Sequence, residues 1–149
     1  MNWAGSIYLL AVAWPLARTD IREHRLPNKY TLPAIVISLI TELLAAAIGN
    51  QWFNFFQAVI CGVLAFSVSL LANRFATLGM GDVKLITAMS LCLGWLSPIA
   101  PVMAVCFAFV IAGVVVLAKL ALRKTRMGQS IALGPYLLIG FVIALVMSC

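Results

Sequence analysis

The longest stretch of the chain without lysine or arginine covers residues 30–73 and reads YTLPAIVISLITELLAAAIGNQWFNFFQAVICGVLAFSVSLLAN. A membrane-spanning helix needs about 20 apolar residues, so this stretch is long enough for two spans. Gly49-Asn50-Gln51 interrupts the stretch near its middle with residues that are typical of a turn. We therefore predict a helical hairpin with spans at residues 31–49 and 55–73.

The composition of the whole chain indicates a membrane protein. Of its 149 residues, 64% are apolar and 9% are charged, and the mean hydropathy is +1.12. A soluble domain has about 45–50% apolar and about 25% charged residues. The values argue against a soluble enzyme, a disulfide-rich secreted module and a disordered chain. The predicted fold class is an all-α polytopic membrane protein, because a bilayer accepts helices that are apolar on every face.

The basic residues are segregated along the chain, and their positions predict the topology. The clusters are Arg18, Arg22, Arg25 and Lys29; Arg74 and Lys84; and Lys119, Arg123, Lys124 and Arg126. The stretches without lysine or arginine are 1–17, 30–73, 85–118 and 127–149. If they supply one, two, two and one helices in that order, all basic clusters lie on the same side of the membrane. Lysine and arginine in short loops stay in the cytoplasm, so we predict six spans with both termini outside. The predicted spans are 3–18, 31–49, 55–73, 83–97, 102–119 and 131–148.

The sequence indicates no metal, cofactor or nucleic-acid partner. Four cysteines, Cys61, Cys92, Cys106 and Cys149, stand singly in apolar segments, and His24 is the only histidine. These positions match neither a CxxC pair nor the ligand spacing of a zinc site. The net charge of +6 is accounted for by the segregated topology, so we interpret it as a sign of orientation in the bilayer. The oligomeric state is not indicated.

Carboxylates at membrane depth are costly, so they usually have a partner or a function. Glu42 falls in the outer half of the second predicted span, where we expect it to reach the outer face or to hydrogen-bond a neighbouring helix. Asp20 follows the first span and Asp82 begins the fourth, so the topology places both at the cytoplasmic face. Two aspartates that meet there can share one proton. The ionised carboxylate could then activate water against a peptide carbonyl, while the protonated one polarises the carbonyl oxygen and protonates the leaving nitrogen.

Two glycines, Gly79 and Gly81, stand immediately before Asp82. Glycine permits unusual backbone torsions and the close approach of another chain. An extended substrate could therefore add main-chain hydrogen bonds at this position. A helix amino terminus favours an ionised aspartate, which makes Asp82 the preferred base. The alternative is structural, with a glycine turn and Asp82 as the N-cap of the fourth helix.

Three motifs resemble those of the type IV prepilin peptidases, which are membrane aspartic proteases marked by a GxGD motif. Gly79–Leu85, which reads GMGDVKL, is similar to the GxGDxKL-like block of the family. Asp20 is followed by Arg25–Asn28, which reads RLPN and resembles the family's basic residue and I/L-P-N. Leu133–Tyr136, which reads LGPY, is similar to the family's F/L-G-P-F/Y stretch. The motifs occur in the family's order and extend over nearly the whole six-span peptidase core.

The resemblance implies that Asp20 and Asp82 are the catalytic pair of an aspartic endopeptidase. It also implies residues that bind substrate or shape the site: Gly79, Gly81, Lys84, Arg25, Pro27, Asn28, Gly134 and Pro135. The implied substrate is a pilin-like precursor, cut between a short basic leader and a hydrophobic helix, usually after glycine. Cleavage would occur at the cytoplasmic face of the cytoplasmic (inner) membrane.

Larger relatives also carry a methyltransferase region, often with paired CxxC motifs, which these 149 residues lack. We therefore expect a single domain, residues 1–149, with peptidase activity and without methyltransferase activity. Such a chain is similar to the stand-alone enzymes of tight-adherence pili and archaellum systems.

Two other functions remain open from the sequence. One is a small proton-coupled transporter in which Asp82 and Glu42 relay protons, which predicts charged residues near mid-membrane on broken helices. The other is a non-catalytic subunit of a pilus or secretion machine, in which both aspartates would be dispensable. The exact precursor is not indicated.

Overall fold

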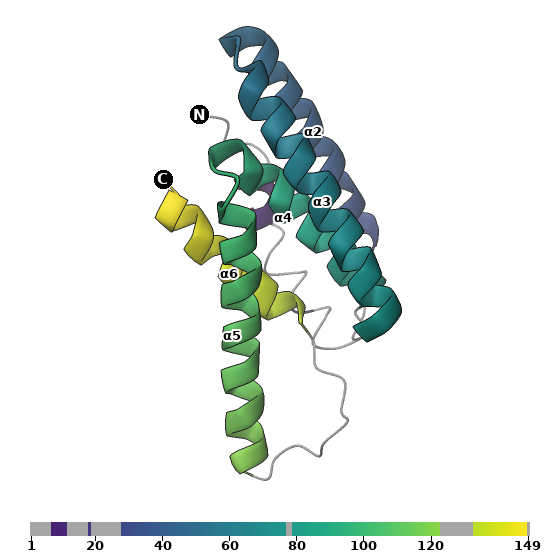
Figure 1. Ribbon diagram of the computed structural model, residues 1–149, viewed down its shortest axis with the longest axis vertical. Helices are drawn as coiled ribbons and strands as arrows, with labels where there is room; N and C mark the ends of the chain where they lie inside the picture. The colour runs from purple at the N-terminus through teal and green to yellow at the C-terminus, as the bar shows by residue number, and fades with distance from the viewer. Residues whose placement is uncertain (1–6, 12–17, 19–27, 77–78, 123–132, 149) are drawn as a thin grey trace.

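The computed structural model describes residues 7–11, 18, 28–76, 79–122 and 133–148, and every regular element in these ranges is helical. Residues 7–11 and residue 18 are helical, and five longer helices follow (Figure 1). Their bounds are α2 Asn28–Gly49, α3 Trp52–Ala76, α4 Met80–Leu96, α5 Ala100–Ala121 and α6 Gly134–Ser148. The predicted all-α fold class is confirmed.

The helix ends agree with the sequence prediction to within three residues for the second to sixth predicted spans. The first predicted span, 3–18, lies largely outside the described residues. The predicted turn between α2 and α3 is also confirmed. There Asn50 has a φ of 51°, a left-handed conformation that asparagine tolerates better than most residues. The amide of Gln51 donates to the carbonyl oxygen of Ala46 at 3.1 Å, which satisfies one carbonyl at the end of α2.

Within the described part of the chain, three helices are long and apolar enough to cross a membrane: Thr31–Gly49, Trp52–Phe75 and Ala100–Ala121. Less than a third of each is buried inside the protein, at 22%, 17% and 28% respectively. Large apolar side chains therefore remain exposed along these helices, as with Phe56, Val63 and Val110. In a membrane protein, lipid covers such apolar surfaces, so these helices indicate a membrane protein. The α6 helix is apolar but shorter, with 15 residues.

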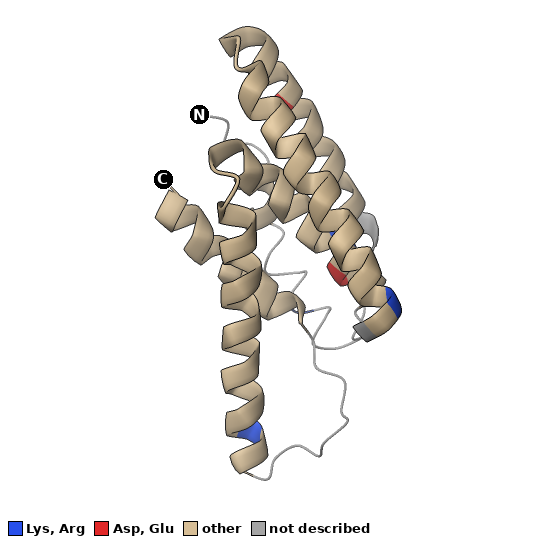
Figure 2. Ribbon diagram, in the orientation of Figure 1, with Lys and Arg blue, Asp and Glu red and all other residues tan. Residues whose placement is uncertain are grey.

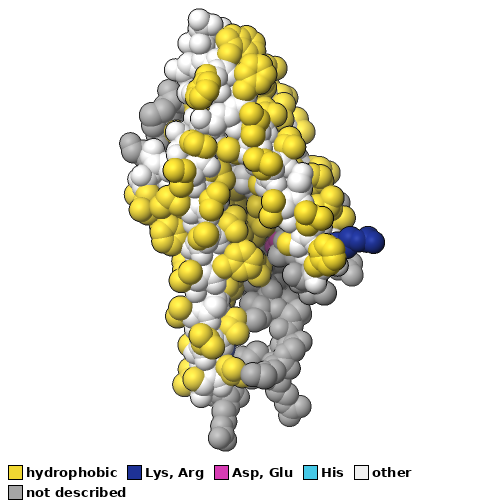
Figure 3. All heavy atoms as spheres, viewed as in Figure 1, with side chains coloured by type: hydrophobic (Ala, Val, Ile, Leu, Met, Phe, Trp, Pro, Cys, Tyr) yellow, Lys and Arg dark blue, Asp and Glu magenta, His cyan; other side chains and the backbone are white. Residues whose placement is uncertain are grey.

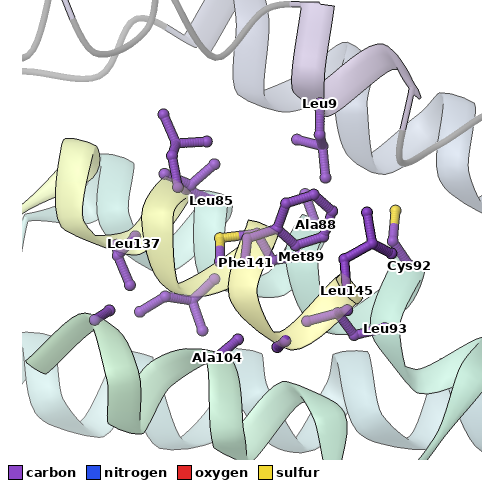
Figure 4. Packing of buried hydrophobic residues seen from close by; sticks show 14 of the residues in the cluster. Leu9, Leu85, Ala88, Met89, Cys92, Leu93, Ala104, Leu137, Phe141 and Leu145 are labelled. Atoms are coloured by element: carbon purple, nitrogen blue, oxygen red, sulfur yellow. The ribbon is translucent and has the colours of Figure 1, made fainter. Parts of the chain in front are cut away.

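The fourth helix, α4, is the centre of the bundle. It packs against α2, α3, α5 and α6, and its side chains from Leu85 to Trp95 are all buried. Figure 1 shows α2 and α3 paired on one side of it and α5 and α6 paired on the other. The shared core joins Leu85, Met89 and Leu93 of α4 to side chains of α6 such as Phe141 (Figure 4). A helix that is apolar all round has to be enclosed in this way or face lipid.

Small residues let the helices approach closely. A Cβ at Gly94 of α4 would lie 2.8 Å from the Cβ of Cys61 on α3. Between α5 and α6, a Cβ at Gly140 would collide with the carbonyl oxygen of Ala104 and lie 2.9 Å from the amide nitrogen of Ala108. Close backbone packing over glycine and alanine is the usual way in which helices associate inside a bilayer.

The contact at Gly140 generates a stability prediction. We expect Gly140→Ala to force α5 and α6 apart and to destabilise the protein by about 1–3 kcal/mol. Thermal unfolding in detergent measures the effect as a lower Tm. The matched control is Gly113→Ala, because a Cβ at Gly113 meets nothing within 4 Å and alanine has the higher helix propensity. Equal Tm values for the two variants would contradict the packing argument.

Candidate active site

Asp82 lies in the first turn of α4, where the central helix begins. Gly79 is the N-cap residue, and the amide of Val83 donates to its carbonyl oxygen at 3.2 Å. Asp82 is therefore the third residue of the helix, and the alternative that it is the N-cap is wrong. An acidic side chain in the first turn is stabilised in its ionised form by the partial positive charge of the helix amino terminus.

The carboxylate of Asp82 folds back over Gly79. A Cβ placed on Gly79 would lie 3.0 Å from Oδ2 of Asp82 and 3.7 Å from its Cγ. The backbone of Gly79 is extended, with φ −63° and ψ 139°, a conformation that any residue adopts. The expected unusual torsion is therefore absent at Gly79, and a Cβ there would come into tight contact with the carboxylate. The role of Gly79 in the site stays a prediction, and the structure adds its position beside the carboxylate.

Three of the motif segments lie at helix amino ends. Asn28 begins α2, Gly79 caps α4, and Gly134 begins α6. Helices α2, α4 and α6 run in the same direction, and α4 contacts both of the others (Figure 1). The structure therefore brings the amino ends of three parallel helices to one end of the bundle. Their dipoles add positive potential at that end, where Asp82 is half-buried.

The start of α6 agrees with the third motif. Gly134 is buried and Pro135 is the second residue of the helix. The carbonyl oxygen of Leu133 accepts hydrogen bonds from the amides of Tyr136 and Leu137, each at 3.1 Å. Proline is tolerated at this position because amides of the first helical turn have no partner within the helix. The motif therefore starts a helix that packs on the core of α4.

Several predicted site residues cannot be placed relative to Asp82. Asp20, Arg25 and Pro27 lie outside the described residues, and only the backbone position of Asn28 is described. The pairing of the two aspartates therefore stays a prediction. Lys84 is half-buried in α4, two residues after Asp82. Among the described residues, Arg74 lies at the carboxyl end of α3, Lys119 at the carboxyl end of α5 and Lys84 near the amino end of α4 (Figure 2).

Of the two expectations for Glu42, the one that it reaches the outer face is wrong, because its side chain is buried. Its side chain is 3% exposed, and its Oε2 has no hydrogen-bond partner among the described residues. One turn earlier on α2, Ser38 hydrogen-bonds the Sγ of Cys92 on α4 at 3.1 Å. Glu42 therefore lies on the face of α2 that packs toward the inside of the bundle, and the surrounding helices prevent it from reaching water.

Glu42 is also far from Asp82. Cys92 is ten residues beyond Asp82 on α4, and Glu42 is four residues beyond Ser38 on α2. At about 1.5 Å per residue these steps separate the two carboxylates by about 20 Å along the bundle. A direct proton relay between them, as the transporter alternative requires, has no support in this geometry.

A sequence model of the type IV leader peptidase family matches residues 7–148. The chain belongs to the type IV leader peptidase family. The matched range contains all three motifs, from Asp20 to Tyr136, including those outside the described residues. In this member of the leader peptidase family, the GxGD motif, Gly79–Asp82, lies at the amino end of α4.

Two curated relatives support the assignment to the leader peptidases. The chain is 29% identical over 151 residues to the prepilin leader peptidase/N-methyltransferase of Pectobacterium carotovorum subsp. carotovorum, covering 97% of this chain and 51% of that protein. It is 36% identical over 76 residues to the prepilin peptidase EppA of Methanocaldococcus jannaschii, covering 50% of this chain and 19% of that protein. The chain thus spans about half the length of the first relative and about a fifth of the second. No solved structure matches it.

The position of Gly79 generates a prediction about the site. We expect Gly79→Ala to displace the Asp82 carboxylate by a few tenths of an ångström and to slow cleavage of a pilin-like precursor about tenfold. Alanine adopts the backbone conformation of Gly79 without strain, so the Tm should change little. Cleavage rate and Tm are measured on the same preparation, with Gly113→Ala as the control. Full activity of Gly79→Ala would show that the space beside the carboxylate is not needed.

Proposed function

We propose that the chain is a membrane-embedded aspartic endopeptidase that removes the short basic leader from pilin-like precursors. The observation that carries the proposal is the Gly79–Asp82 motif at the amino end of the buried central helix, in a chain that the family matches over residues 7–148. The proposed cut lies between the leader and the hydrophobic helix of the precursor, usually after glycine. The proposal concerns peptide-bond cleavage and includes no methyl transfer.

In the proposed mechanism, Asp20 and Asp82 hold one proton between them. The ionised carboxylate takes a proton from water as the water oxygen attacks the scissile carbonyl carbon. The protonated carboxyl donates a hydrogen bond to the carbonyl oxygen and then protonates the leaving nitrogen. The helix amino terminus beside Asp82 favours its ionised form, so we assign the base to Asp82. No metal or cofactor takes part in these steps.

The remaining motif residues have proposed roles around this pair. Gly79 leaves space for the Asp82 carboxylate, and Gly81 lets the substrate backbone approach. Lys84 and Arg25 contact substrate or tune an aspartate. Asn28 starts α2, and Gly134 and Pro135 start α6, so we propose that these residues shape the walls of the site from neighbouring helix ends. Pro27, which precedes Asn28 in the sequence, is proposed to act with it.

We place the site at the cytoplasmic face of the cytoplasmic (inner) membrane, in one domain of six spans, residues 1–149, with both termini outside. The parallel directions of α2, α4 and α6 support this arrangement, because they put Asn28, Asp82 and Gly134 at one end. Three of the described basic residues, Arg74, Lys84 and Lys119, also lie at the helix ends that this topology assigns to the cytoplasm.

The catalytic proposal predicts that each aspartate is essential. Asp20→Asn and Asp82→Asn should each lower cleavage of a co-expressed precursor by at least about 100-fold, since each removes an acid–base group. The loss is measured by the gel shift of the processed product, and mass spectrometry locates the cut. Glu42→Gln is the control, because it changes a buried carboxyl that lies away from the site. Cleavage at the normal rate by either aspartate variant would disprove the proposed pair.

The topology predicts which loops are accessible from outside the cell. In a Cys149→Ser background, Gln51→Cys in the turn between α2 and α3 should react with a membrane-impermeant maleimide on intact cells. Lys124→Cys should react only after the membrane is opened, because its cluster is predicted to be cytoplasmic. The reversed pattern would place the aspartates on the outer face and contradict the proposed location.

A further inference from the structure

An apolar groove runs between α3 and α5, with α4 as its floor. Its volume is about 340 Å³. Val68 and Ala72 of α3 form one wall, Val102 and Phe109 of α5 form the other, and Ile86 and Ser90 of α4 lie between them. Helices α3 and α5 each pack on α4, and Figure 3 shows hydrophobic side chains along both walls. The groove is therefore open on the side that faces lipid.

The groove leads to Asp82. Asp82, Ile86 and Ser90 are spaced four residues apart on α4, so they share one face of that helix. Ile86 and Ser90 line the groove, and Asp82 lies one turn before them, at the end where α3 finishes. The other end of the groove is lined by Pro98 and Pro101, at the turn between α4 and α5. A segment that lies in the groove thus has one end beside the aspartate.

The chemistry of the lining selects an apolar helix. No lining residue is charged, and the hydroxyl of Ser69 on the α3 wall is already bonded to the carbonyl oxygen of Ala65. An occupant at membrane depth has to satisfy its own backbone hydrogen bonds, which an α-helix does. Alanine, serine and cysteine in the lining also permit close approach of another helix. The α4 floor consists of Ile86 and Ser90, which are four residues and therefore about 6 Å apart along the helix.

We propose that the groove holds the hydrophobic helix of the precursor while the bond at its cytoplasmic end is cut beside Asp82. This inference rests on the proposed function, because it names where that substrate's apolar segment lies. The helix enters sideways from lipid between α3 and α5. Its amino end then points to Asp82, which places the leader and the scissile bond at the cytoplasmic face. Lipid chains and a second copy of this chain are the competing occupants.

The kinetic test uses two valines of α5 with nearly equal exposure. Val102 lines the groove and is 61% exposed, whereas Val110 lies outside it and is 62% exposed. Both are replaced by tryptophan in enzyme reconstituted with full-length precursor in phosphatidylethanolamine–phosphatidylglycerol vesicles. We expect Val102→Trp to raise the KM for precursor about tenfold with kcat little changed, because it removes substrate binding. Val110→Trp should match the unaltered enzyme. Equal kinetics for the two variants would overturn the groove assignment.

The binding test uses a photoreactive phenylalanine in the inactive Asp82→Asn enzyme, so that precursor is bound and not cut. Benzoyl-phenylalanine replaces Phe109, which lines the groove, or Phe66, an exposed phenylalanine of α3 outside it. We expect cross-links to the precursor helix from position 109 and none from position 66. Cross-links from 109 only to lipid, or to a second copy of the chain, would overturn the inference.

The two tests also separate the inference from the proposed function. If the unaltered enzyme cuts precursor and the Val102 and Phe109 results fail, the function stands and the groove assignment is wrong. If the unaltered enzyme cuts no pilin-like precursor, the proposed function fails and the groove assignment fails with it.

Discussion

The enclosure of α4 is the constraint on which the rest of the structure depends. A helix of 17 residues with its side chains buried from Leu85 to Trp95 needs neighbours on every side. In a bilayer these neighbours are held by close packing, because lipid removes the hydrophobic driving force between helices. Gly94 and Gly140 supply the close approaches on opposite sides of the bundle. Asp82 then lies at the end of this enclosed helix, which would hold the proposed catalytic carboxylate in position.

The same arrangement explains how a chain with few polar residues can form a site. Helices α2 and α6 both pack on α4 and run in the same direction as α4, so the helix dipole beside Asp82 adds to the positive charge of Lys84. Gly79 leaves the space that the carboxylate occupies. The apolar groove beyond Ile86 begins on the same face of α4. Cleavage chemistry and recognition of an apolar segment are thereby proposed for adjacent parts of one helix.

Much of the fold could be predicted from the sequence, because lysine and arginine clusters and turn residues mark the helix ends. The central place of α4 could not, since most spans are apolar on all faces and hydropathy does not say which one is enclosed. Glu42 was misplaced for a related reason: its depth could be estimated, but the side of α2 toward which it points depends on packing. For the candidate site, the motif predicted Asp82 and Gly79, whereas the closeness of Gly79 to the Asp82 carboxylate could be seen only in the structure. The position of Asp20 relative to Asp82 lies outside the described residues.

The short length of α4 has a consequence for water. Its 17 residues extend about 25 Å, which is less than the roughly 30 Å thickness of a hydrocarbon core. In the proposed six-span topology, the polar end of this short helix therefore lies beneath the headgroups. In that topology, lipid acyl-chain length sets the depth to which solvent has to descend to reach Asp82. The surrounding lipid would then be part of the hydration pathway of the proposed site.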